Sequence, residues 1–136
     1  MQIKRLQIDD YLCLVDFDIV FDTVSGGSST ILIGENGAGK STMIECILNI
    51  LMSFDSPAIE KQIDYSYSME YNYAQKAVCI VQSNHNYRIT VDDAFCEGSY
   101  KRVRSFIQSH SLFPQRIIAF YSGANNKLLP QIERIN

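Results

Sequence analysis

The 136-residue sequence predicts a single α/β domain with a mixed central sheet and an antiparallel β-subdomain. Three observations support this prediction. A short apolar run precedes a glycine-rich loop, a helical apolar repeat follows the loop, and several segments of alternating residues lie further along the chain. Strand, loop and helix in this order form the unit that a phosphate-binding loop requires. A chain of this length can bury about two thirds of its unfolded surface in one core.

The first segment, residues 1–57, contains the opening strands, the loop and its helix. Alternating apolar residues predict strands over 3–8 and 12–21, which we expect to pair antiparallel. The apolar run 31–33 is typical of a buried central strand. After the loop, apolar residues at three- and four-residue spacing predict a helix to about Leu51, and Pro57 then prevents its continuation.

The second segment, residues 58–92, is predicted to be the antiparallel β-subdomain. Strands are expected over 65–73, 77–81 and 87–91, because these pieces are rich in β-branched and aromatic residues and polar turns separate them. The first piece carries tyrosines at alternate positions. We interpret them as a half-exposed strand face in preference to a platform for stacking nucleic-acid bases.

The third segment, residues 93–136, is predicted to contain a helix over 99–110 and a buried strand over 117–120. Apolar residues of the helix should face inward. Its basic residues should face solvent, although contact with a phosphate backbone is an alternative: Lys101, Arg102 and Arg104.

Composition excludes several classes of protein. The 15 acidic and 12 basic residues give a formal net charge of −3, which provides no general attraction to nucleic acid or anionic lipid. The four cysteines are spaced singly and predict neither a metal knuckle nor a disulfide framework. The sequence shows no secretory signal and no run long enough to span a membrane. We therefore expect a cytoplasmic protein without a membrane partner.

The glycine-rich loop carries the chemistry. Its glycines let successive backbone N–H groups point into one concavity, where they can hydrogen-bond phosphate oxygens, and the following helix adds a partial positive charge. ATP with Mg²⁺ is the expected ligand. Lys40 should reach the β- and γ-phosphates as the catalytic residue, Ser41 should ligate Mg²⁺, and Thr42 can bind the α-phosphate. The complete set of expected binding residues is Gly34, Glu35, Asn36, Gly37, Ala38, Gly39, Lys40, Ser41 and Thr42.

The string ILIGENGAGKSTMIECI, after the opening MQIKRLQIDDYLCLVDFDIVFD, resembles the amino-terminal half of ABC-type ATPases. The likeness is specifically to the soluble branch that contains RecF, SMC proteins and the AAA-type ATPases of bacterial defence systems. This resemblance implies an ATP-binding lobe over residues 1–136. It also implies homo-oligomerisation through ATP-bound heads, a nuclease or other effector subunit, and action on DNA or RNA in phage defence or DNA repair.

The resemblance covers only the front half of that fold, so we expect an incomplete head. Segments 24–27 and 89–93 imitate parts of the signature and Walker B motifs, but a turn and a strand explain them better. Without those motifs, this segment should bind ATP better than it hydrolyses it. Two alternatives remain open: a nucleotide-dependent assembly module with little or no hydrolysis, and a transporter motor domain.

A few other residues have weaker functional interpretations. The string RIIAFYSGANNKL resembles the Q-loop region, where a polar residue senses the γ-phosphate, but the sequence does not decide among Ser122, Asn125 and Asn126. A transporter motor would have a glutamine there. Tyr11 lies near the adenine by this resemblance, or it only packs in the core. His85 and His110 are expected to be exposed polar residues.

Overall fold

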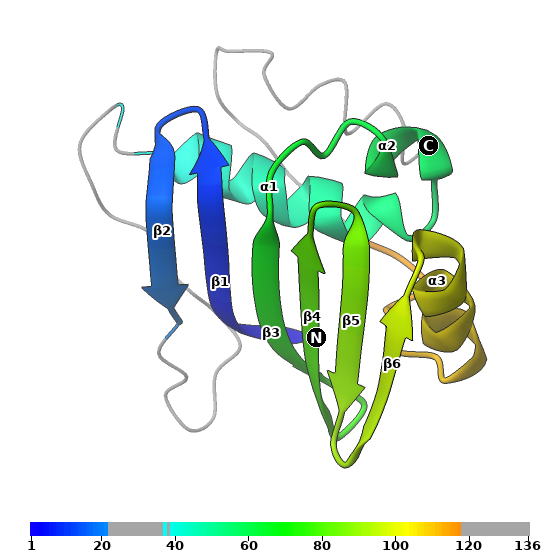
Figure 1. The fold of residues 1–136 in the computed structure, drawn as a ribbon. Coiled ribbons are helices and arrows are strands. Elements are labelled where there is room, and N and C mark those ends of the chain that lie inside the picture. Colours follow the sequence, from blue (N-terminus) through cyan, green and yellow to red (C-terminus); the bar gives the residue numbers. More distant parts are fainter. Residues whose placement is uncertain (22–36, 38, 118–136) are drawn as a thin grey trace.

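The computed structural model describes residues 1–21, 37 and 39–117 (Figure 1). Within this part of the chain, one antiparallel sheet has the strand order β2-β1-β3-β4-β5-β6. The strands are β1 (Gln2–Tyr11), β2 (Leu14–Val20), β3 (Tyr67–Tyr73), β4 (Lys76–Ser83), β5 (Asn86–Val91) and β6 (Ala94–Gly98). The helices are α1 (Lys40–Ser53), α2 (Pro57–Glu60) and α3 (Tyr100–Ser109). The expected strand over 31–33 lies outside the described residues, as does the expected strand over 117–120 apart from its first residue.

The expected opening hairpin is confirmed. β1 pairs antiparallel with β2, from Arg5 opposite Val20 to Tyr11 opposite Leu14. β1 extends further than its apolar alternation indicated, because the pairing with β2 continues almost to the turn. The turn residue Leu12 has a positive φ of 53°. The hairpin tip therefore lies at residues 12 and 13.

The segment expected to form the antiparallel β-subdomain, residues 58–92, contributes strands that are antiparallel and join the sheet of the opening strands. β3 pairs antiparallel with β1, with Leu6 opposite Met69 and Ile8 opposite Tyr67. The meander of β3, β4 and β5 is confirmed, but it also has a further strand, β6, paired with β5. The short sequence of β6, AFCEG, lacks the alternation that would have predicted it. All six strands therefore form one continuous sheet.

α1 lies across one face of the sheet (Figure 1). Its apolar residues Met43, Cys46 and Ile50 belong to a buried cluster with residues of several strands, including Leu6, Ile8, Met69, Ile80 and Ile89. The helix was predicted to end near Leu51 and ends at Ser53. Pro57 then occupies the first turn of α2, where its missing N–H has no helical partner to lose.

The alternate tyrosines of residues 65–73 do not form the half-exposed face that was expected. Tyr65, Tyr67 and Tyr71 are at most 3% exposed and point into the core. The hydroxyl of Tyr71 donates to the backbone oxygen of Leu112 at 3.1 Å, whereas Tyr65 and Tyr67 have no hydrogen-bond partner among the described residues. The phenol rings fill the space between the sheet and its helices, which excludes their use in stacking bases.

α3 was expected as a helix over 99–110 and is confirmed, with Ser99 as its N-cap. Val103 and Ile107 are buried and Phe106 is partly buried, as predicted. Arg104 does not face outward with Lys101 and Arg102. Its guanidinium donates to the backbone oxygens of Phe54 and Asp55 at 2.8 and 3.1 Å, and so satisfies carbonyls at the end of α1.

Burial of the tyrosines makes the fold sensitive to alkaline pH. Burial raises the pKa of Tyr65 well above its ordinary value, and it raises the pKa of Cys46 to about 11. In the unfolded chain these groups ionise at about pH 10 and about pH 8.5. Their contribution to stability is therefore fully present below the unfolded pKa and is lost as pH rises toward the folded value.

We predict that the free energy of unfolding declines above about pH 9, because the unfolded chain releases protons that the folded chain retains. Tyr65→Phe should make the decline shallower, by at most about 1.4 kcal/mol per pH unit. The loss of its unpartnered hydroxyl should cost little stability at pH 7. Urea unfolding across this pH range measures both effects. An unchanged slope in the variant would contradict the burial of this phenol.

Candidate functional site

The N-terminus of α1 is the candidate site. Gly39 is its N-cap and has φ 90° and ψ 6°, a left-handed conformation that favours glycine. The first helical hydrogen bond runs from the N–H of Met43 to the oxygen of Gly39 at 2.8 Å. Gly39 provides no side-chain cap, and the first turn of the helix has no acidic residue. Because the first N–H groups of a helix lack helical partners, this end is suited to an anion.

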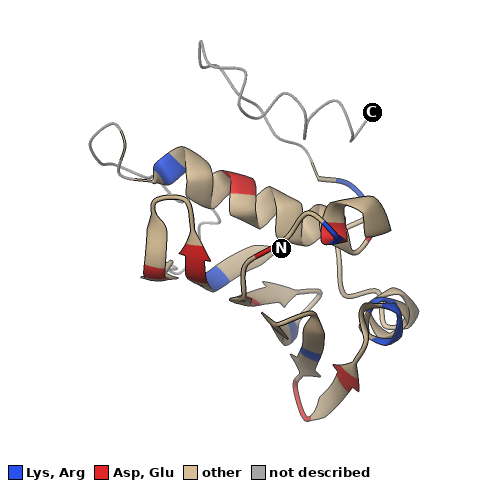
Figure 2. Ribbon diagram, turned by 45° about the horizontal axis from the view of Figure 1, so that its top comes forward, with Lys and Arg blue, Asp and Glu red and all other residues tan. Residues whose placement is uncertain are grey.

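The helix places three of the expected ligand-binding residues together in its first turn. Lys40, Ser41 and Thr42 are its first three residues; Ser41 is exposed, and the other two are partly buried. Figure 2 marks a basic residue at the start of α1. Gly37 is exposed and, like Gly39, has a φ of 90°. The remaining expected residues lie outside the described part of the chain: Gly34, Glu35, Asn36 and Ala38.

The tip of the β1–β2 hairpin packs against this end of the helix. A Cβ atom on Gly39 would lie 2.8 Å from Leu14 Cδ2 and 3.3 Å from Cys13 Sγ. Cys13 Sγ also lies 3.6 Å from Thr42 Oγ1, within hydrogen-bonding range for sulfur. Sequence reasoning missed this contact. Cys13 is a singly spaced cysteine, and no local pattern indicates that it lies beside a residue 29 positions later.

Tyr11 makes a second contact between the hairpin and α1. Its hydroxyl donates to Glu45 Oε1 at 3.4 Å, and its ring lies 4.5 Å from the ring of Tyr65, with 42° between their planes. Partial burial, followed by the charge of Glu45, raises the pKa of Tyr11 to about 12. Tyr11 therefore packs in the structure and stays protonated at neutral pH. Its expected position near an adenine stays a prediction.

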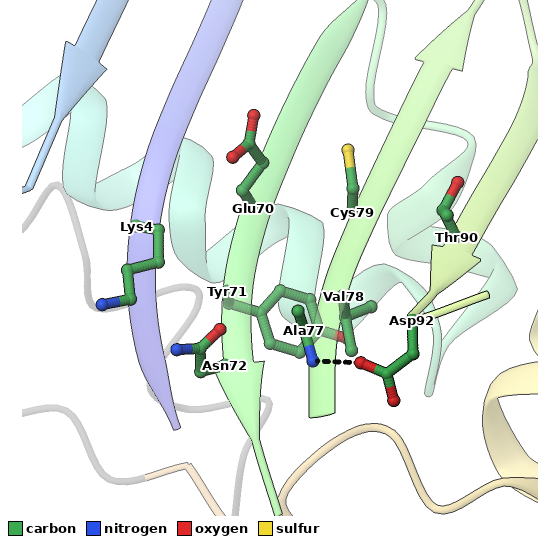
Figure 3. A pocket seen from close by; sticks show the side chains of 9 residues that line it. All are labelled: Lys4, Glu70, Tyr71, Asn72, Ala77, Val78, Cys79, Thr90 and Asp92. Carbon is green, nitrogen blue, oxygen red and sulfur yellow. Dashed lines mark hydrogen bonds between the residues drawn. The ribbon is translucent and has the colours of Figure 1, made fainter. Parts of the chain in front are cut away.

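The sequence segment that imitates a Walker B motif ends in a hairpin turn. β5 ends at Val91, and Asp92 has a positive φ of 49°. Its carboxylate accepts a hydrogen bond from the N–H of Ala77 at 3.2 Å, which closes the turn against β4. Asp92 also lines an open hollow of about 230 Å³ on the sheet face that points away from α1 (Figure 3). This carboxylate therefore stabilises a turn away from the candidate site.

The two histidines are exposed, as expected. His85 lies in the β4–β5 turn, 3.7 Å from Glu60 Oε1, which also accepts a hydrogen bond from the hydroxyl of Tyr87 at 2.9 Å. His110 ends α3 with its ring near the oxygen of Phe106. Over residues 1–21, 37 and 39–117, no group of histidine, cysteine, aspartate or glutamate side chains is arranged to hold a metal. The loop alternatives Ser122, Asn125 and Asn126 lie outside that part of the chain.

Comparison with known proteins identifies the family. A family model described as an AAA domain matches residues 5–123, which includes the whole glycine-rich loop and most of the described fold. No curated protein and no solved structure matches the chain.

The chain belongs to this AAA domain family. It is therefore a nucleotide-binding, ATPase-like module, and domains of this kind generally depend on ATP and Mg²⁺. The fold is a mixed α/β structure with a six-stranded antiparallel sheet in its described part. None of the described helices combines the length and apolar character needed to cross a membrane.

We predict that Gly39→Ala destabilises the protein more than Gly37→Ala. Both substitutions place a side chain at a φ of 90°, which costs about 1–2 kcal/mol. Only at position 39 does the added Cβ meet Leu14, at 2.8 Å, whereas nothing lies within 4 Å at position 37. Chemical unfolding of both variants measures the difference. Equal losses would contradict close packing between the hairpin tip and α1.

Proposed function

We propose that this chain is the ATP-binding lobe of an ABC-type ATPase and that it binds Mg²⁺–ATP at the N-terminus of α1. The observation that carries the proposal is the start of this helix at Gly39, a left-handed glycine N-cap that provides no side-chain cap, with no acidic residue in the first turn. The first N–H groups of a helix lack acceptors within the helix, and a phosphate group provides several. Membership of the AAA domain family supports ATP as the source of that phosphate.

The roles of the first-turn residues follow from the chemistry of their side chains. The ammonium group of Lys40 neutralises charge on the β- and γ-phosphates, and this charge grows on the transferred group during hydrolysis. The Ser41 hydroxyl is exposed and provides an oxygen ligand for Mg²⁺. The Thr42 hydroxyl, on the side facing Cys13, binds the α-phosphate.

The hairpin tip supplies a surface for the nucleoside. Leu12 is 70% exposed, and its neighbour Cys13 contacts the first turn of α1. An exposed apolar side chain beside a phosphate site suits the face of a purine base, which gains from leaving water. In this proposal the base lies against the tip. Tyr11 holds the tip in place through its contacts with Glu45 and Tyr65.

The biological role rests on the resemblance to RecF and SMC-like proteins. By that analogy, two ATP-bound heads associate, and the ATPase acts on DNA or RNA together with a nuclease or other effector, in phage defence or DNA repair. The catalytic carboxylate and the signature loop of such a head would come from outside the described residues. A cytoplasmic location fits this role.

A nucleotide-dependent assembly module is the second candidate. The placement of Asp92 favours it, because the segment most like Walker B closes a hairpin turn and does not supply a carboxylate to the helix N-terminus. ATP turnover by the protein, measured with and without DNA, separates the two functions. DNA-stimulated turnover supports the nucleic-acid ATPase, whereas nucleotide-dependent oligomers without turnover support the assembly module.

We predict that Lys40→Ala weakens Mg²⁺–ATP binding by roughly ten- to a hundredfold, because a charge-assisted hydrogen bond to phosphate is lost. Isothermal titration calorimetry measures the affinity. Lys101→Ala is the matched control: it removes a basic, exposed residue of α3 and should leave affinity unchanged. Removal of Mg²⁺ by a chelator should weaken binding to the wild-type protein. Equal affinity in wild type and Lys40→Ala would refute the proposed site.

A further inference from the structure

We infer that Cys13 is a positioning residue for nucleotide binding, acting through Thr42. Its thiol donates a hydrogen bond to the Thr42 hydroxyl, which then directs its own hydrogen toward a phosphate oxygen of the bound nucleotide. This inference rests on the proposed function, because it concerns how the chain holds the nucleotide at the start of α1. It assigns a role to a residue of the β1–β2 hairpin, far from the glycine-rich loop in sequence.

The position of the sulfur carries the argument. Cys13 Sγ lies 3.6 Å from Thr42 Oγ1 and would lie 3.3 Å from a Cβ on Gly39. The thiol is therefore in contact with the first turn of α1, between its N-cap and its third residue. A side chain at position 39 would not fit between α1 and the hairpin, because its Cβ would lie 2.8 Å from Leu14 Cδ2.

The hairpin tip is held in this position from two sides. Leu14 is 2% exposed and belongs to the buried core, whereas its neighbour Cys13 is exposed. Tyr11 joins the same hairpin to Glu45, one turn beyond Thr42 on α1. Because the burial of Leu14 and the hydrogen bond of Tyr11 both fix the hairpin, the side chain of Cys13 can orient a hydroxyl without a large loss of entropy.

The direction of the hydrogen bonds decides the effect on a ligand. A threonine hydroxyl in a helix commonly donates to a backbone oxygen three or four residues earlier, which would occupy its hydrogen. When the Thr42 oxygen accepts a hydrogen bond from the Cys13 thiol, the hydrogen of the Thr42 hydroxyl must point away from the sulfur. In this inference, that hydrogen is directed to the helix end where the phosphates would lie. A chain of two hydrogen bonds also strengthens each member.

The test is a double-mutant cycle read by Mg²⁺–ATP affinity. Cys13→Ala removes the donor, and we expect about three- to tenfold weaker binding, the value of one net hydrogen bond. Thr42→Val removes the hydroxyl and keeps the branched shape. In that background, Cys13→Ala should have no further effect, because the thiol acts only through the hydroxyl.

Cys13→Ser keeps a donor and should bind within about twofold of wild type, which a purely structural role for sulfur would not require. Cys96→Ala, on β6, is the control for loss of a cysteine and should bind as wild type does. Thermal unfolding verifies that every compared variant is folded. Because Cys13 is exposed, these substitutions should not prevent folding.

The outcomes separate this inference from the proposed function. If wild-type protein does not bind Mg²⁺–ATP, both fail. If wild type binds and Lys40→Ala does not, but Cys13→Ala binds normally, only the inference is overturned. Independent, additive losses in Cys13→Ala and Thr42→Val also overturn it, as does a Cys13→Ser variant no better than Cys13→Ala. The inference is supported if Cys13→Ala weakens Mg²⁺–ATP binding in the wild-type background but causes no further loss of affinity in the Thr42→Val background.

Discussion

The contact between the tip of the opening hairpin and the first turn of α1 is the constraint on which the site depends. Gly39 combines a φ of 90° with a neighbour, Leu14, too close for any Cβ. The same residue is the N-cap, and glycine has no side chain that could accept a hydrogen bond from the first N–H groups of the helix. One glycine thus permits the packing of the helix on the hairpin at the same end where we propose that the phosphates bind.

The rest of the described fold keeps this contact in place. β1 lies between β2 and β3, so the hairpin is joined to a sheet that extends to β6. The buried tyrosines fill the layer between this sheet and α1, and Arg104 and Tyr100 of α3 bond backbone oxygens near the far end of α1. The helix is therefore fixed at both ends, and a ligand at its N-terminus would meet a rigid frame.

The elements that local sequence patterns encode were predictable. The hairpin, α1, the meander and α3 follow from alternation, from three- and four-residue spacing and from turn residues, and the AAA domain match agrees with the loop motif. The pairing of β3 with β1 was not predictable. It joins residues about 60 positions apart, and no local sequence pattern indicates which strand will be the neighbour of β1. The contacts of Cys13 with Thr42 and of Arg104 with Phe54 were missed for the same reason.

The most direct test of the central claim is a titration of the protein with Mg²⁺ and inorganic tripolyphosphate, followed by amide NMR. Tripolyphosphate presents the anion without the base, so it reports only on the helix N-terminus. We predict that the largest shifts occur at the amides of residues 39–42, with smaller shifts at Cys13 across the contact. Shifts confined to other parts of the chain, with residues 39–42 unchanged, would contradict it.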